Sequence, residues 1–156
     1  MILTKPHEKQ YSVQSFRLRY KCSIPPPATP LTTPGAVTDV TRAVFGKLDG
    51  GLSVEHFGAW FLNSQSMIIG FKAFNTGTVD QVAVYPRMII HTALMVGAAA
   101  LVLVHNHPSG ITEPSEEDKR LTKTLVDAGR FFDMRVVDHI IIGQDKHFSF
   151  VERGLI

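Results

Sequence analysis

A continuous apolar run constrains the fold of this chain more than any other feature. Residues 99–105 read AALVLVH, and the chain then continues directly into Asn-His-Pro-Ser-Gly. The run does not alternate between apolar and polar residues, so it predicts a strand that is covered on both faces. A strand of this kind lies in the middle of a sheet that carries helices on both sides.

The remaining segments alternate between helical and strand patterns. Thr33 followed by Pro34 is typical of a helix start, and apolar residues then recur at helical spacing as far as Leu48. The turn-prone residues 63–66 divide two aromatic and aliphatic runs into a predicted hairpin. We therefore expect an α/β fold with a mixed β-sheet and flanking helices. The predicted elements are helices at 34–48, 86–98 and 115–129, hairpins at 54–78 and 135–154, and the central strand.

The length of 156 residues favours one domain. Residues 1–34 form a polar arm with a proline-rich spacer, which includes a possible short strand at 16–22. Residues 35–156 form the predicted domain. The apolar runs are too short to cross a membrane, the N-terminus lacks a signal-peptide pattern, and Cys22 has no partner cysteine, so we expect a soluble cytoplasmic protein without membrane partners. A net charge of +2 without a basic stripe leaves nucleic-acid binding open but unsupported.

The end of the central strand carries two histidines. Residues i and i+2 of a strand point to the same face, so His105 and His107 present their imidazoles together while Asn106 points away. Neutral imidazole suits Zn²⁺, which in catalytic sites binds three protein ligands and one water. Ser115 precedes Glu-Glu-Asp in a helix N-cap pattern, which places Asp118 in the first helical turn. Asp118 is the predicted third ligand.

Hydrolysis at such a site also needs a base and a donor for the developing oxyanion. Glu55 is the one glutamate beside an apolar strand, and we interpret it as the general base that takes the proton from zinc-bound water. The hydroxyl of Ser115 could cap the helix and also donate to the oxyanion. Four other histidines are interpreted as core or surface residues, namely His56, His91, His139 and His147. We also expect Asp138 or His139 to contact one of the metal ligands from behind.

The pattern formed by these residues resembles the JAMM motif of the MPN metalloproteases. His105-x-His107, seven residues, Ser115, two residues and Asp118 follow the upstream Glu55. The strings HNHPSG and 138-DHIIIG-143 are similar to the RadC group of bacterial JAMM proteins, long labelled DNA repair proteins. The resemblance covers residues 37–156, and it implies a JAMM/MPN sandwich of the cytidine-deaminase-like type. It also implies zinc bound by the two histidines and Asp118, with Glu55 as base and Ser115 as oxyanion donor.

These observations predict a zinc-dependent metallohydrolase that acts on a peptide or protein. A metallopeptidase or isopeptidase is the preferred interpretation. The alternative is a RadC-type protein of DNA repair or mobile elements, with its zinc structural or nucleolytic. Longer RadC proteins carry an N-terminal helix-hairpin-helix region, in place of which this chain has the short arm. A binding module that has lost catalysis is a third alternative, although such modules typically lack the ligands. The substrate and the oligomeric state stay open.

Overall fold

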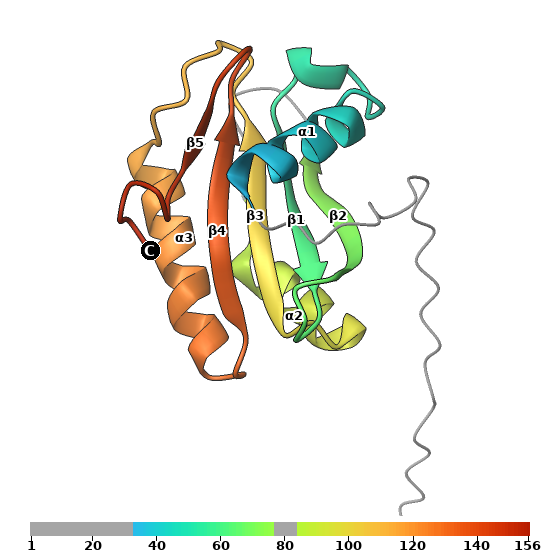
Figure 1. The fold of residues 1–156 in the computed structure, drawn as a ribbon, viewed down its shortest axis with the longest axis vertical. Coiled ribbons are helices and arrows are strands. Elements are labelled where there is room, and N and C mark those ends of the chain that lie inside the picture. Colours follow the sequence, from blue (N-terminus) through green and yellow to red (C-terminus); the bar gives the residue numbers. More distant parts are fainter. Residues whose placement is uncertain (1–32, 77–83) are drawn as a thin grey trace, which may run out of the picture.

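The computed structural model describes residues 33–76 and 84–156, and it contains a five-stranded mixed sheet with helices on both faces (Figure 1). The arm and the predicted strand at 16–22 lie outside the described residues. Within the described ranges, no helix combines the length and the apolar character that a membrane crossing requires. The sheet order is β2-β1-β3-β4-β5. In chain order the elements are α1 (Pro34–Phe45), the 3₁₀ turn η1 (Gly51–Ser53), β1 (His56–Leu62), β2 (Ile68–Thr76), α2 (Pro86–Val96), β3 (Ala100–Asn106), α3 (Glu116–Arg130), β4 (Arg135–Ile142) and β5 (His147–Ser149).

The predicted central strand is β3, which is buried along its whole length. It pairs antiparallel with β1 and parallel with β4, so the sheet is mixed as expected. Its side chains alternate between two apolar clusters. Leu101 and Leu103 pack with residues of α2 and α3, whereas Val102 and Val104 pack on the face that α1 covers. This alternation decides which face receives each residue at the end of the strand.

Helix α1 covers one face of the sheet, and α2 and α3 cover the other (Figure 1). On the α1 face, Phe45 and Trp60 are fully buried, and the Trp60 indole Nε1 donates to Thr41 Oγ1 at 2.8 Å. On the opposite face, Ile89 of α2 and Leu125 of α3 have no exposed surface. Burying a side chain of this size stabilises the fold by roughly 1.5–3 kcal/mol. Both helical layers are therefore held to the sheet by apolar packing.

Helix α1 is shorter than the sequence predicted. It ends at Phe45, and Leu48 lies in the turn that follows. The backbone amides of Lys47 and Leu48 donate to Val44 O and Phe45 O, both at 3.0 Å, so the chain tightens to i→i+3 bonds after the helix. Leu48 still packs against the α1-side core. Its apolar spacing therefore reports burial correctly, although the helix has already ended.

Candidate metal centre

The end of β3 positions the two histidines of the predicted pair on the α3 side of the sheet. His105 has the same parity as Leu103 and is 1% exposed, and His107 follows the last residue of the strand. Their Nε2 atoms lie 3.0 Å apart. The backbone amide of His107 donates to Ile142 O of β4 at 2.9 Å, which continues the strand pairing past the end of β3. The pair is therefore fixed by the sheet.

The first turn of α3 brings Asp118 to the histidines. Ser115 is the N-cap of this helix, as the sequence predicted, and it forms a capping box with Asp118. Asp118 Oδ2 accepts from the Ser115 amide at 2.8 Å and from the Ser115 hydroxyl at 2.6 Å. Asp118 Oδ1 lies 3.4 Å from His105 Nε2, and Oδ2 lies 3.9 Å from His107 Nε2. The cap thus orients the carboxylate toward both rings.

Glu55 reaches the same place from the segment that precedes β1. One of its carboxylate oxygens and the ligand atoms of His105 and His107 all lie within 4.8 Å of one another. Burial raises the pKa of the Glu55 carboxyl above its usual value. His107 opposes this increase, and the neighbouring Asp118 adds to it. We call Glu55, His105, His107 and Asp118 the candidate metal centre.

A chain of hydrogen bonds behind His105 sets the protonation of its ring. The Thr122 hydroxyl donates to Asp118 O at 2.6 Å, because a carbonyl can only accept. Thr122 Oγ1 therefore accepts from His139 Nδ1, also at 2.6 Å, which leaves His139 Nε2 without a proton. His139 Nε2 then accepts from His105 Nδ1 at 2.8 Å. His105 consequently carries its lone pair on Nε2, the atom that faces Asp118 and His107.

Burial keeps the rings of His105 and His139 neutral. It lowers the pKa of His105 to about 4, with Asp118 opposing the decrease. It also lowers the pKa of His139 well below its usual value, and the positive charge that His105 would carry when protonated acts in the same direction. Phe150 stacks on the His139 ring at 4.7 Å between centroids, and Phe57 stacks on the His105 ring at 6.0 Å. Water is therefore excluded from the back of the site.

His107 is set in the same tautomer by the loop that follows it. Its Nδ1 donates to Ile111 O at 2.6 Å, so its lone pair is also on Nε2. The loop is anchored at Gly143, where an added Cβ would lie 2.5 Å from Gly110 O. No side chain fits at Gly143 without moving that backbone. The loop carrying Ile111 therefore packs directly on the chain that leaves β4.

Two lone pairs thus converge at 3.0 Å beside a carboxylate, and two acceptors at this distance repel each other unless a cation lies between them. Ligands of a tetrahedral zinc at 2.0–2.1 Å lie about 3.3–3.4 Å apart. The His105–His107 separation of 3.0 Å and the His105–Asp118 separation of 3.4 Å are close to this spacing. Imidazole nitrogen and carboxylate oxygen are also donors that zinc accepts. The residues present therefore fit a zinc ion.

Two sets of three ligands are compatible with this geometry, and they share the histidines. The sequence predicted Asp118 as the third ligand and Glu55 as base. The carboxylate of Glu55 also lies close enough to complete a set with the two rings. The structure brings all four residues together, and the choice between the carboxylates belongs to the proposal below.

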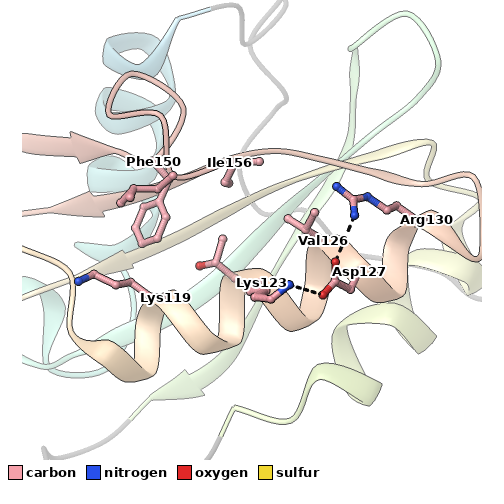
Figure 2. Close-up of a pocket in the computed structure, with 9 residues that line it drawn as sticks. Lys119, Lys123, Val126, Asp127, Arg130, Phe150 and Ile156 are labelled. Carbon is pink, nitrogen blue, oxygen red and sulfur yellow. Dashed lines mark hydrogen bonds and ion pairs between the residues drawn. The ribbon is translucent and has the colours of Figure 1, made fainter.

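Two cavities differ in their relation to this centre. One, of about 420 Å³, lies between α3 and the C-terminal segment, where Lys123 and Arg130 both pair with Asp127 (Figure 2). None of the four centre residues lines it. The other, of about 260 Å³, is lined by His107, Asn106 and Ser53. Of the four centre residues, only His107 lines this smaller cavity.

His56 and His91 match their interpretation as core or surface residues. His56 hydrogen-bonds through Nε2 to Gly51 O at 2.8 Å, and His91 is exposed on α2. The contact predicted behind the ligands is made by His139. Asp138 instead accepts from Ser149 Oγ at 2.6 Å, which ties β4 to β5. Sequence reasoning missed Thr122, although its position one helical turn after Asp118 places it on the same face of α3.

Comparison with known proteins identifies the family to which this centre belongs. The RadC-like JAB domain family matches residues 31–155. The chain belongs to the RadC-like JAB family. The match contains the whole candidate metal centre, and the mixed sheet with its flanking helices is consistent with a JAMM/MPN domain.

Curated bacterial relatives share this domain. A UPF0758 protein of Leptothrix cholodnii is 44% identical over 124 residues, which cover 80% of this chain and 54% of the relative. A UPF0758 protein of Saccharophagus degradans is 48% identical over 102 residues, covering 65% and 46%. A third, from Chromohalobacter salexigens, is 47% identical over 100 residues, covering 64% and 45%. The chain spans about half the length of the curated relatives it matches.

Proposed function

We propose that the chain is a zinc-dependent metallohydrolase that cleaves a peptide or isopeptide bond. The observation that carries this proposal is the convergence of two histidine lone pairs at 3.0 Å beside two carboxylates. Hydrogen bonds from Nδ1 of each ring leave these lone pairs free for a cation. A zinc ion would lower the pKa of a coordinated water toward neutrality and would polarise the substrate carbonyl.

His105, His107 and Asp118 would hold the zinc in this proposal. Asp118 is the better carboxylate ligand because the capping box fixes its orientation at 3.4 Å from His105 Nε2. Glu55 has no hydrogen bond of this kind among the described contacts and is half-buried. Its carboxylate is therefore freer to accept a proton and release it, as a general base must.

Glu55 would move the proton during the reaction. Burial raises the pKa of its carboxyl, so the group accepts a proton near neutral pH more readily than an exposed glutamate. After accepting a proton from the attacking water, the carboxyl can donate it to the leaving nitrogen. These two transfers give Glu55 the role of base and then acid, which matches its side chain beside the histidine pair.

Ser115 would donate to the oxyanion, as the sequence suggested. In the structure its hydroxyl hydrogen points to Asp118 Oδ2. The backbone amide of Ser115 donates to the same oxygen at 2.8 Å, so this oxygen keeps a partner when the hydroxyl rotates toward a substrate. Ser115 can therefore cap α3 in the resting state and donate during the reaction.

A peptide or protein substrate agrees better than DNA with the charges near the centre. Helix α3 carries Asp118 and four basic residues, and each of these four pairs with a carboxylate on the same helix. These pairs leave little free positive charge to neutralise phosphates. They are Lys119–Glu116, Arg120–Glu117, Lys123–Asp127 and Arg130–Asp127.

A substrate screen of the zinc-loaded protein tests the proposal. Peptide libraries, isopeptide-linked lysine conjugates and duplex or single-stranded DNA are incubated with the wild type and with Glu55→Gln. Cleavage of a peptide or isopeptide bond that is lost in Glu55→Gln would support the proposal. Metal-dependent cleavage of DNA, or DNA binding that survives physiological salt, would instead favour the repair-associated alternative.

A further inference from the structure

We propose that Asn106, the residue between the two histidines, is a positioning residue for Glu55. Its carboxamide binds the backbone on both sides of Glu55 and holds the carboxylate against the histidine pair. This inference deepens the proposed function and rests on it for the role of Glu55. The contacts of Asn106 are independent of that role.

Asn106 makes three hydrogen bonds to the segment that carries Glu55. Its Oδ1 accepts from the His56 amide at 2.9 Å, and its Nδ2 donates to Val54 O at 2.9 Å and to Leu52 O at 3.2 Å. The partners thus include both sequence neighbours of Glu55. Asn106 is 2% exposed, so water does not compete for these bonds.

The ladder between β1 and β3 does not reach this segment, and the ladder between β1 and β2 includes only its last residue, His56. The pairing of β1 with β3 ends at Phe57 and His105, one residue before His56 and Asn106. The turn before Glu55 is weakly closed, because its Val54 amide donates to Gly51 O at 3.4 Å. The Asn106 side chain therefore supplies the hydrogen bonds that the β1–β3 ladder would supply if it continued.

The alternation of β3 separates the two tasks at its end. His105 lies on the α3 side with Leu103, whereas Asn106 has the parity of Val104 and faces the other side. The proposed ligand His105 and the positioning residue Asn106 are thus adjacent in sequence but lie on opposite faces of the sheet. Asparagine meets the need because one carboxamide offers an acceptor for the amide and two donors for the carbonyls. Aspartate offers only acceptors when ionised.

The test compares amide exchange, zinc content and crystal structures of the zinc-loaded full chain. In Asn106→Ala we expect the His56 amide to exchange at least about 10-fold faster, since its acceptor is lost. Zinc content should stay at the wild-type value, and the Glu55 carboxylate should move away from the histidines. Unchanged exchange at His56 together with an unmoved carboxylate would overturn the proposal. Loss of zinc would also overturn it, because Asn106 would then support the ligands.

Asn106→Asp is the second variant, and it decides the question if the alanine variant does not fold. Aspartate keeps the acceptor for the His56 amide but loses both donors. We expect the Ser53 and Val54 amides to exchange faster while the His56 amide stays protected. Amide exchange like that of the wild type throughout residues 51–56 would contradict the positioning role of Asn106.

Asn63→Ala is the matched control at the far end of β1. Asn63 Oδ1 also accepts from backbone amides, those of Gln65 and Met67, both at 2.9 Å. This variant should speed exchange in the β1–β2 turn and leave His56 and the zinc unchanged. Equal effects of the two alanine variants on the 51–56 segment would show a general loss of stability and overturn the specific role.

Turnover measurements distinguish a failure of the positioning role of Asn106 from a failure of the proposed function. On a substrate found by the screen, Asn106→Ala should lower kcat about 10-fold or more with little change in KM. When Asn106→Ala is added to Glu55→Gln, kcat should fall by less than about twofold further, because both substitutions remove the same function, proton transfer by Glu55. Full additivity would overturn the positioning role. Full activity of Glu55→Gln alone would refute the proposed function. Amide exchange and the crystal structures would still show whether Asn106 positions Glu55.

Discussion

Replacing Thr122 by valine should weaken zinc binding although it replaces none of the proposed ligands. Valine keeps the shape of threonine and removes the hydroxyl that accepts from His139 Nδ1 at 2.6 Å. His139 then either keeps a buried N–H without a partner or moves its proton to Nε2. In the second case His139 donates to His105 Nδ1, and the proton of His105 moves to Nε2, where a metal would bind.

The magnitude follows from the burial of this chain of hydrogen bonds. Thr122 is 2% exposed and His139 has no exposed surface, so water cannot replace the lost acceptor. An unpartnered buried donor costs about 1–3 kcal/mol, and the ring must bear this cost to keep His105 ready for metal. At about 1.4 kcal/mol for each factor of ten, the zinc Kd should rise roughly 10- to 100-fold, as is typical when the partner of a metal-binding histidine is lost.

Competition with a chromogenic chelator measures the zinc Kd, and nitrogen NMR reports the histidine tautomers. Thr124→Val is the matched control, because Thr124 also bonds one helical turn back, to Arg120 O at 2.8 Å, on the exposed side of α3. Thr122→Ser keeps the hydroxyl and should retain tight binding. A zinc Kd in Thr122→Val equal to that of Thr124→Val, with an unchanged His105 tautomer, would refute the reasoning.

Three further predictions concern turnover and acid stability. Glu55→Gln should keep its zinc and lose roughly 10²-fold or more in turnover, which metal analysis beside a kinetic assay would show; unchanged activity contradicts the assignment. Ser115→Ala should lose about 1 kcal/mol of unfolding free energy in urea and about 10²–10³-fold in turnover; loss of stability alone would make it only a cap. The zinc-free protein should lose stability as the pH falls from about 6.5 toward 4, because the folded pKa of His105 is lowered to about 4. The lowered pKa of His139 acts in the same direction, and the loss from His105 alone approaches about 3 kcal/mol. Urea denaturation at pH 7 and pH 4.5 checks this, and equal stabilities would contradict it.

The sequence predicts most of this fold because its patterns are local. The unbroken apolar run fixed β3 as the central strand, and Thr33 does cap α1, accepting from Ala36 N at 3.2 Å. The end of α1 was misplaced, since Leu48 keeps helical spacing while the backbone has already tightened. Periodicity reports which side of an element is buried, and it does not report the hydrogen bonds that end the element.

The candidate site is predictable where its residues are close in sequence. His105, His107 and Asp118 follow from strand alternation and the capping box, which involve short separations. The contact of His139 with His105 depends on the register between β3 and β4, in which Leu103 pairs with His139. No local pattern gives that register, so the sequence offered His139 and Asp138 as equal candidates. The carboxamide contacts of Asn106 with residues about 50 positions away were beyond sequence reasoning for the same reason.

Zinc stoichiometry tests the central claim most directly. The wild type and single-site variants are purified without added metal, and metal content is measured per chain. The account predicts one zinc per chain in the wild type and in Glu55→Gln, and loss of most of the zinc in His107→Ala and Asp118→Asn, because two remaining ligands cannot hold the ion. Full zinc occupancy in His107→Ala would contradict the site.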